Sequence, residues 1–300
     1  MNLTQKIKNI TFQNPILLAS GTYGFGLKFS EVINQTGGIV TKTITFNPLI
    51  GNPPPRIYEI EGGVINSVGL ENPGAVYFLK RILPNLKKLT TNLIVSVGGE
   101  SGEEIIKVIK ILDSHQLICA YELNFSCPNV KAGGILLGQE PRMVEKILKK
   151  VKNNTKKPII AKIPATLCNP LEIAKAVENG GGDFVTITNT IPGLVIDVEK
   201  QKPFLGGIIG GISGNFLKYY SLYLIAKIKK IIKIPIIGCG GIKNYRDVLE
   251  YLSCGAMLVE VGTLNLQNPF GIVEIIKDLK KWAKKNKLKN LKEIIGKIEI

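Results

Sequence analysis

The segment Ala120-Tyr-Glu-Leu-Asn-Phe-Ser-Cys-Pro-Asn129 joins a short apolar run to a cluster of amide, hydroxyl and thiol groups. The run over residues 120–124 has the length and composition of a β-strand buried on both faces. Its polar groups follow at the carboxyl end, where parallel α/β sheets present ligand-binding residues. Alone, the segment also fits an inert, buried cysteine in a turn. The order of similar runs along the chain therefore decides the fold.

Eight short, apolar runs rich in β-branched residues recur along the 300 residues. They occupy residues 15–19, 39–43, 93–97, 120–124, 158–163, 183–188, 234–239 and 257–261. Helical patterns lie between them, at residues 102–112, 141–151, 170–179, 215–232 and 244–254, and a further helix follows at residues 269–285. Eightfold alternation of strand and helix over about 250 residues is the signature of a (β/α)8 barrel. The sequence therefore predicts an α/β protein with a TIM-barrel fold, in one domain spanning residues 1–300.

A doubly wound open sheet is the alternative, and the segment after the first strand argues against it. A dinucleotide-binding sheet carries Gly-x-Gly-x-x-Gly there, whereas this chain has Ser20-Gly-Thr-Tyr-Gly-Phe-Gly26. Connections at residues 44–73, 125–139 and 189–214 are longer than a minimal strand–helix loop. All three follow strands, so in a barrel they lie over the mouth, where barrel active sites are found. Residues 3–12 are expected to form a small hairpin that closes the barrel floor.

The composition is that of a globular protein with a strongly basic surface. The chain is 45% hydrophobic with a net charge of +16, but only four of its 39 basic residues are arginine. Base readout and bidentate phosphate contacts favour arginine, so we do not expect nucleic-acid binding. Neither long uncharged stretch, residues 9–27 or 203–217, has the continuity of a membrane span. With no apolar signal region at the N-terminus, we expect a soluble cytoplasmic protein.

The five cysteines, at positions 119, 127, 168, 239 and 254, are odd in number and widely spaced. They include no Cys-x-x-Cys pair, which argues against a disulfide framework, a zinc site or an iron–sulfur cluster within this chain. We therefore expect no bound metal and a reducing compartment.

Polar residues or glycines follow every predicted strand. They are Ser20, Lys42, Thr43, Ser96, Asn124, Cys127, Lys162, Thr188, Asn189, Thr190, Gly240, Gly241, Gly262 and Thr263. The glycines after the last two strands match the barrel phosphate site, and Gly214 before a long helix adds donors. Lys42 and Lys162 lie within otherwise apolar strands, where an unpaired charge is costly. This pattern predicts a phosphate-bearing cofactor with its ring beside the two lysines.

These residues resemble the class 1 dihydroorotate dehydrogenases, specifically the catalytic subunit of class 1B. The resemblance rests on residues 19–21, 41–43, 51–56, 66–74, 122–129, 161–162, 188–190, 238–242 and 261–263, in order along nearly the whole chain. The segments 66–74 and 122–129 are specific, whereas the glycine loops occur in many phosphate-binding barrels. Class 2 relatives have serine in the position of Cys127 and usually a membrane segment, so both features point to class 1.

The resemblance implies FMN-dependent oxidation of dihydroorotate to orotate in pyrimidine biosynthesis. It places FMN against Ser20, Lys42, Thr43, Asn124, Lys162, Thr188, Gly214, Gly240, Gly241, Gly262 and Thr263. Ser96 also falls in this set, although the family usually has asparagine there and the shorter hydroxyl has less reach. It places dihydroorotate against Lys42, Asn66, Ser67, Val68, Gly69, Leu70, Asn124, Asn129, Asn189 and Thr190. Cys127 takes the role of the general base at C5, under a loop over residues 125–139 that closes on the ring.

For class 1B the resemblance further implies a partner subunit with FAD and a [2Fe–2S] centre, which passes electrons to NAD. The assembly would be a heterotetramer built on a homodimer of this chain. Three alternatives stay open on the sequence. A class 1A homodimer would use fumarate, a dihydropyrimidine dehydrogenase-like FMN barrel would act on a related ring, and a non-redox barrel would only bind phosphate.

Overall fold

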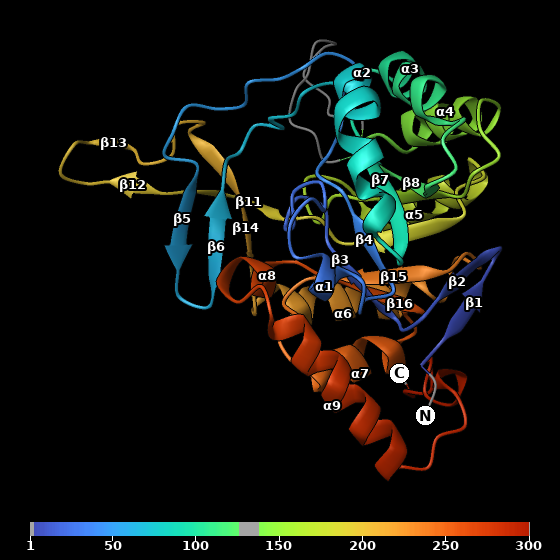
Figure 1. Cartoon of the computed structure of the whole chain (residues 1–300). Helices are drawn as coiled ribbons and strands as arrows, with labels where there is room; N and C mark the ends of the chain where they lie inside the picture. Colours follow the sequence, from blue (N-terminus) through green and yellow to red (C-terminus); the bar gives the residue numbers. More distant parts are fainter. Residues whose placement is uncertain (1–2, 126–137, 300) are drawn as a thin grey trace.

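The computed structural model describes residues 3–125 and 138–299, and its centre is a closed barrel of eight parallel strands (Figure 1). In chain order these strands are β3 (Ile16–Leu18), β4 (Gly38–Val40), β7 (Asn92–Val97), β8 (Ile118–Asn124), β9 (Ile159–Lys162), β10 (Phe184–Ile187), β15 (Ile236–Cys239) and β16 (Leu258–Val261). The predicted TIM barrel is confirmed, since each of the eight apolar runs contributes one barrel strand.

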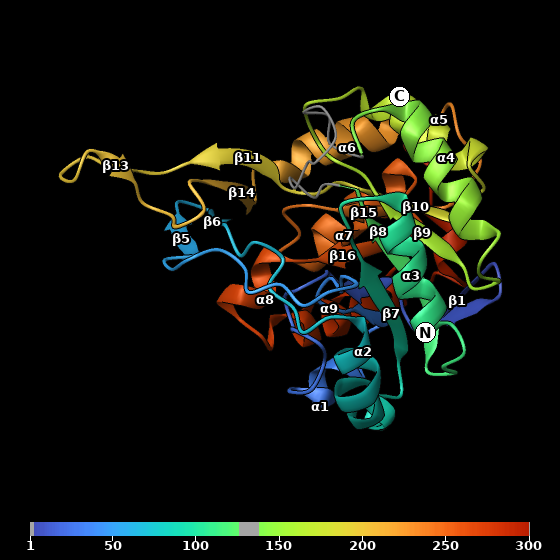
Figure 2. The same cartoon turned by 90° about the horizontal axis from the view of Figure 1, so that it is seen from above.

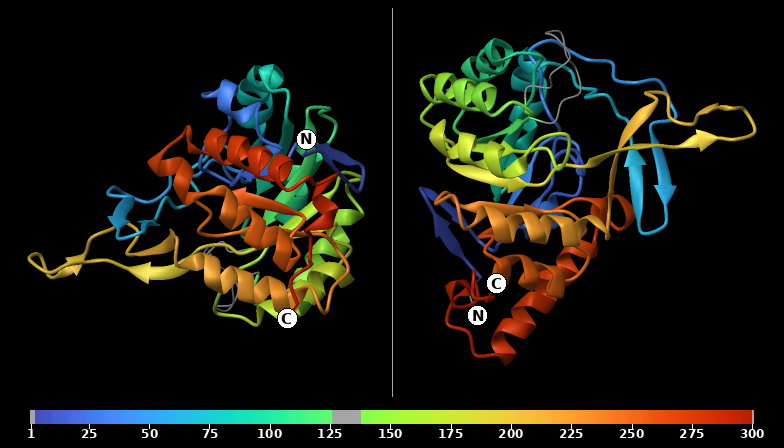
Figure 3. Two further views of the ribbon diagram at one scale, coloured as in Figure 1. Left: turned by 90° about the horizontal axis from the view of Figure 1, so that it is seen from below. Right: turned by 180° about the vertical axis from the view of Figure 1, so that it is seen from behind.

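Helices surround the barrel, and the longer ones each bury an apolar face. They are α1 (Ser30–Ile33), α2 (Ala75–Tyr77), α3 (Gly102–Leu112), α4 (Pro141–Lys152), α5 (Pro170–Asn179), α6 (Leu217–Ile228), α7 (Tyr245–Cys254), α8 (Thr263–Gln267) and α9 (Gly271–Lys285). Short turns η1 (Phe78–Ile82) and η2 (Leu83–Lys88) continue α2, and η3 (Leu291–Glu293) follows α9. Figure 3 shows α6, α7 and α9 packed together along one side of the barrel.

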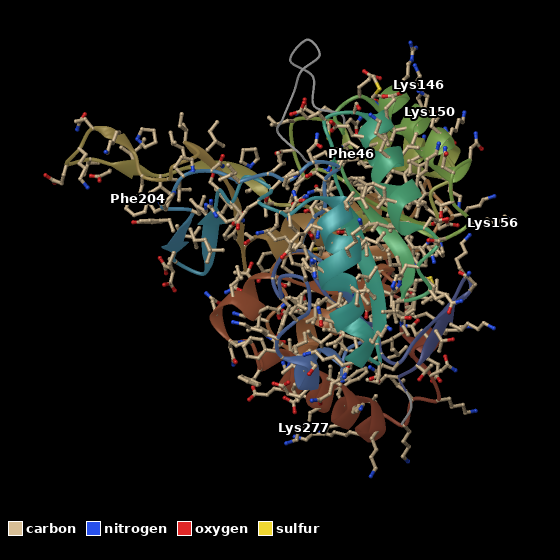
Figure 4. All side chains as sticks on the ribbon, turned by 45° about the horizontal axis from the view of Figure 1, so that its top comes forward. Phe46, Lys146, Lys150, Lys156, Phe204 and Lys277 are labelled. Carbon is tan, nitrogen blue, oxygen red and sulfur yellow. The ribbon has the colours of Figure 1, made fainter. Side chains whose placement is uncertain are left out.

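The helix α4 shows why the charge pattern does not disturb the core. Its buried residues Val144, Ile147, Leu148 and Val151 follow helical spacing. Its lysines lie on the opposite face, and Figure 4 shows Lys146 and Lys150 at the periphery of the molecule. The predicted solvated lysine faces are therefore present on this helix.

A short hairpin closes the floor of the barrel, as the sequence predicted. Its strands β1 (Gln5–Ile7) and β2 (Ile10–Phe12) bury Ile7, Ile10 and Phe12. These side chains pack in one cluster with inward-facing residues of the barrel strands, namely Leu17, Val40, Ile94, Ala120, Ile160, Phe184, Ile237 and Leu258. Because strand side chains alternate, the residues two positions further along each strand form the next layer above this floor.

Two of the three long connections pair with each other outside the barrel, which the sequence did not predict. Strands β11 (Ile191–Leu194), β14 (Ile209–Gly214), β6 (Gly63–Asn66) and β5 (Ile57–Ile60) form an antiparallel sheet in that order. Beyond it, β12 (Ile196–Asp197) and β13 (Lys202–Pro203) form a hairpin that projects away from the barrel (Figure 2). Phe204, which directly follows β13 and is labelled in Figure 4, packs edge-on against Tyr58, with the two ring centroids 4.9 Å apart. Both connections were expected to be loops.

Among the residues that the structure describes, no helix has the length and apolar character needed to cross a membrane.

Candidate active site at the barrel mouth

A chain of hydrogen-bonded side chains crosses the mouth of the barrel. The hydroxyl groups of Ser96 and Thr43 lie 2.9 Å apart, and Asn124 Nδ2 lies 3.4 Å from Thr43 Oγ1. Asn189 Nδ2 donates to Asn124 Oδ1 over 3.1 Å, and the backbone N–H of Thr190 donates to Asn189 Oδ1 over 2.9 Å. Five residues that follow or end four different strands are thus joined in one network.

The backbone group at one end of this network determines its direction. The N–H of Thr190 can only donate, so the side chain of Asn189 presents its oxygen there and its amide nitrogen to Asn124. Asn124 then presents its own nitrogen to Thr43, whose hydroxyl also bonds to that of Ser96. Each amide is therefore held in one orientation, as required to read a ring with fixed donors and acceptors.

Lys42 reaches the mouth because the second barrel strand is interrupted. The strand ends at Val40, shorter than the predicted 39–43, and the N–H of Lys42 bonds to Gly24 O at 2.8 Å. Pairing with β7 resumes at Ile44, whose N–H bonds to Ser96 O. An irregularity of this kind re-aims side chains at a sheet edge. The expectation that Lys42 is buried inside a strand is therefore wrong, since its side chain is 25% exposed and lies 3.6 Å from Glu71 Oε2.

The segment Asn66 to Leu70 is held over the mouth by the antiparallel sheet. Asn66 Nδ2 donates to Gly211 O at 3.3 Å, and Ser67 Oγ donates to Ile209 O at 2.7 Å. Asn52 donates from Nδ2 to Ser67 O at 3.0 Å and from its backbone N–H to Val68 O at 3.1 Å. Pairing between two distant connections thus fixes the position of this segment.

Arg56 and Glu71 connect that segment to Lys42. The guanidinium of Arg56 donates to Glu71 Oε2 at 2.5 Å, to Asn52 O at 2.5 Å and to Ile50 O at 3.0 Å. The same carboxylate oxygen of Glu71 faces Lys42 Nζ. Because a guanidinium presents its donors as a rigid fork, Arg56 sets the position of Glu71.

Glycines at the ends of β14 and β15 and a hydroxyl after β16 form a cradle beside these groups. Gly241 has φ of +65°, and a Cβ there would lie 2.8 Å from the carbonyl oxygens of Gly214 and Asn215. Thr263 begins the short helix α8, and its Oγ1 donates to Ser213 Oγ at 2.9 Å. The backbones approach so closely that no side chain fits, which suits a phosphate held by backbone N–H groups.

The remaining predicted residues of this region lie at the same end of the barrel. Ser20 donates from Oγ to Thr41 O at 2.9 Å. Thr188 is buried, with its Oγ1 3.4 Å from Ser221 Oγ, and Ser221 in turn donates to Cys239 O. Gly240 has φ of +128°, a conformation that favours glycine. Gly262 precedes α8 directly.

Lys162 points into the barrel, where its Nζ lies 2.6 Å from Glu260 Oε2. Burial opposes its charge, but the ionised Glu260 outweighs burial and raises the pKa of Lys162 well above its usual value. Burial, followed by the charge of Glu260, raises the pKa of Glu122 well above its usual range. The side chains of both glutamates are fully buried.

Glu122 and Glu260 were not predicted as site residues. The signal was present, since each is an acidic residue within an apolar strand, like Lys162 itself. A buried lysine requires a counter-ion, so acidic residues in the other apolar strands are the candidates for its partner.

Two predicted residues, Cys127 and Asn129, lie outside the described residues. The described residues on either side are Phe125 and Gly138, which lie against each other, since a Cβ on Gly138 would meet Phe125 O. All other predicted site residues follow or end barrel strands at the mouth, or lie in or directly after a strand of the antiparallel sheet.

A TIM barrel with a close-packed glycine cradle, a buried lysine and an oriented pair of amides at its mouth has the architecture of a barrel enzyme. Residues 2–282 match the family model for dihydroorotate dehydrogenase. The chain belongs to this family.

Relatives of similar length carry more specific names. The chain is 41% identical over 302 residues to the "Dihydroorotate dehydrogenase B (NAD(+)), catalytic subunit" of Caldicellulosiruptor bescii, covering all of both chains. It is 42% identical over 298 residues to the protein of the same name from Desulforamulus reducens, covering 99% and 98% of the two chains. A third such protein, from Thermodesulfovibrio yellowstonii, is 42% identical over 296 residues, with 98% of each chain covered.

Proposed function

We propose that this chain is the FMN-containing catalytic subunit of an NAD-linked dihydroorotate dehydrogenase, and that it oxidises dihydroorotate to orotate for pyrimidine synthesis. The observation that carries the proposal is the meeting, at one barrel mouth, of the Gly241 cradle and the oriented amides of Asn124 and Asn189. The first suits the phosphate of a nucleotide cofactor. The second suits a flat ring with alternating N–H and C=O groups.

The residues present fit FMN. The proposed phosphate cradle consists of Gly214, Gly240, Gly241, Gly262 and Thr263, and the backbone around Gly241 approaches too closely to admit a side chain there. The remaining residues proposed to hold the cofactor are Ser20, Lys42, Thr43, Ser96, Asn124, Lys162 and Thr188. FMN supplies a hydride acceptor when it is bound. Ser96 acts through Thr43, because its hydroxyl is fully buried against that residue.

Dihydroorotate is bound by groups from both the barrel and the antiparallel sheet. We assign Lys42 to the carboxylate of the substrate, since Lys42 is a partly exposed cation at the mouth. Asn66, Ser67, Val68, Gly69, Leu70, Asn124, Asn129, Asn189 and Thr190 complete the proposed set. The fixed directions of the amides orient the ring before reaction, which lowers the entropic part of the barrier.

Cys127 is the proposed general base. Cys127 follows Asn124 by three residues in the sequence, which supports this role because Asn124 belongs to the proposed ring-binding set. A thiolate there would remove the proton from C5 of dihydroorotate, and the proton would reside on Sγ. The loop predicted over residues 125–139 lies outside the described residues except at Phe125, Gly138 and Gln139.

Electrons leave this chain for NAD through a second subunit. The names of the three relatives include both NAD(+) and "catalytic subunit", which supports such a partner. We propose that the partner carries FAD and a [2Fe–2S] centre and that the assembly is a heterotetramer built on a homodimer of this chain. The same names favour NAD over fumarate as the acceptor.

The visible spectrum of the purified chain tests the function. The protein should be yellow, and dihydroorotate should bleach its flavin absorbance in the absence of air, whereas dihydrouracil should not. A colourless protein that cannot be reconstituted with FMN would contradict the proposal. Bleaching by dihydrouracil alone would favour a dihydropyrimidine dehydrogenase-like activity.

Variants of Cys127 test the base. Cys127→Ala should still bind orotate but reduce FMN with dihydroorotate about 100-fold to 10,000-fold more slowly, the range expected for general base catalysis. Cys127→Ser should retain activity mainly at high pH, because serine is a far weaker base. Undiminished reduction by Cys127→Ala at neutral pH would remove Cys127 from this role.

A further inference from the structure

Four polar side chains occupy the barrel interior, one layer above its apolar floor. Glu122, Lys162, Thr186 and Glu260 lie on β8, β9, β10 and β16, each two residues beyond a member of the floor cluster. Glu122, Thr186 and Glu260 are 0% exposed and Lys162 is 6% exposed. Cys239 on β15 also faces this layer, and burial raises the pKa of its thiol to about 12, so it stays neutral.

The contacts of Thr186 favour a proton on one of the two carboxyl groups. Its Oγ1 lies 3.2 Å from Glu260 Oε1 and 3.3 Å from Glu122 Oε2. A hydroxyl has a single proton, so it can donate to only one of two carboxylates. The second contact is a hydrogen bond only if that carboxyl group is protonated and donates to Thr186.

The other contacts show which glutamate carries the proton. Glu260 Oε2 accepts from Lys162 Nζ over 2.6 Å, a charge-assisted bond that favours an ionised Glu260. Glu122 Oε1 has no hydrogen-bond partner among the described residues. A buried carboxylate oxygen in that situation is far more costly than the carbonyl oxygen of a neutral carboxyl group. The proton therefore belongs on Glu122.

We propose that Glu122 and Glu260 form a carboxyl pair that shares one proton and positions Lys162, with Glu260 as its ionised partner and Glu122 as a neutral reserve. The carboxyl pair itself does not depend on the proposed function. Only the statement that Lys162 faces the FMN ring rests on it. Neither glutamate touches substrate, so both are positioning residues. The raised pKa of Glu122, caused by burial and then by Glu260, agrees with this assignment.

The pair keeps one negative charge beside Lys162 even when one member is lost. If Glu260 becomes glutamine, Glu122 no longer faces an ionised neighbour and gives up its proton. If Glu122 becomes glutamine, Glu260 is unchanged. Only the double variant leaves Lys162 with an uncompensated positive charge, which stabilises a negatively charged ring more strongly. The effects of the two substitutions are therefore non-additive, as expected for residues in one network.

Infrared spectroscopy of the purified protein tests the shared proton without reference to activity. Glutamate labelled with ¹³C at its side-chain carboxyl group separates its band from the carbonyl bands of the flavin. At pH 7 the wild type should show one protonated-carboxyl band, and both Glu122→Gln and Glu260→Gln should lose it. Glu103→Gln is the matched control, because Glu103 is exposed and its hydrogen bond from Lys150 lowers its pKa. A wild type without the band, or a band that survives in Glu260→Gln, would overturn the proposal.

The midpoint potential of bound FMN, measured against a reference dye, tests the effect on Lys162. The double variant should shift to a more positive potential by more than the sum of the two single variants. Additive shifts, or no shift, in variants that still bind FMN and are still reduced by dihydroorotate would overturn the positioning role and leave the proposed function intact.

A wild type that binds no FMN would refute the proposed function, and the infrared spectra would still decide the carboxyl pair. If the double variant does not fold, those spectra of the single variants decide it as well.

Discussion

The side-chain amide of Asn189 donates to Oδ1 of Asn124 over 3.1 Å and so joins the ends of β8 and β10 across the barrel mouth. Its direction follows from the N–H of Thr190, which occupies the other end of the Asn189 amide. A backbone donor thereby orients two side chains. The site is preorganised by this contact, since a ligand meets amides whose donors and acceptors already point in fixed directions.

Asn189→Ala should remove this orientation. Both bonds of the amide are lost, and a typical cost of about 2 kcal/mol corresponds to roughly a 30-fold lower kcat/KM for dihydroorotate. Most of the change should appear in KM, because the amides act on binding. Stopped-flow reduction of FMN over a range of substrate concentrations measures it. Asn85→Ala, which removes an exposed amide bonded to Arg81 O, is the matched control and should leave KM unchanged.

Arg56→Lys should weaken substrate binding while leaving FMN in place. Lysine cannot reproduce the fork that reaches Glu71, Asn52 and Ile50 together, so Glu71 would lose its fixed position beside Lys42. We expect KM to rise about tenfold, since a charge-assisted contact is worth about 1.5–3 kcal/mol. Arg81→Lys, on an exposed arginine, serves as the control. A KM equal to that of the wild type would show that Glu71 needs no guanidinium.

Gly241→Ala should weaken FMN binding. A methyl group at Gly241 would lie 2.8 Å from two backbone oxygens and 2.9 Å from Lys218 N, where the cradle cannot yield without moving β14 or α6. Gly181→Ala is a matched control. Gly181 also has a positive φ, of +83°, but a Cβ there would meet only Lys152 Cγ, at an ordinary contact distance of 3.5 Å. Both variants carry backbone strain of about 1–3 kcal/mol. Only Gly241→Ala should lower FMN affinity, by at least about tenfold, in a fluorescence titration. Equal losses in both variants would mean that strain alone is responsible.

The barrel was predictable from the sequence because its signals are local. Most strands are almost continuously apolar runs, and helices such as Gly102–Leu112 and Pro170–Asn179 have the predicted bounds. Glycines and polar residues after strands mark the mouth for the same reason. Alternation of strand and helix then determines which ends of the strands meet.

Features that depend on distant partners were not predictable in this way. Strand β6 pairs with β14 through a register that includes glycines 63, 211 and 214, and nothing within either segment specifies the other as its partner. Lys42 leaves the predicted strand because its N–H bonds to Gly24 O, a contact between two loops. Glu122 and Glu260 become one unit only when β8 and β16 face each other inside the closed barrel.

The cysteines yield a prediction that separates Cys127 from the four others. Burial raises the pKa of Cys119 and Cys239 to about 12 and that of Cys168 to about 11, and it also raises the pKa of Cys254. At pH 8 these groups are almost entirely thiols, and the thiolate is the nucleophile. Iodoacetamide should therefore label one site in the native protein, Cys127, with loss of activity in proportion to labelling.

Peptide mass spectrometry after limited alkylation at pH 8 identifies the labelled residue, and orotate should slow the reaction by covering it. Cys168→Ser is the matched control, because Cys168 is partly exposed and its removal should change neither the rate nor the extent of labelling. Labelling above pH 10 should spread to Cys168 first, since its pKa is about 11 and it is more exposed than the buried Cys239 and Cys254. Inactivation at pH 8 that tracks alkylation of Cys168 would contradict the assignment of Cys127 as the reactive thiol.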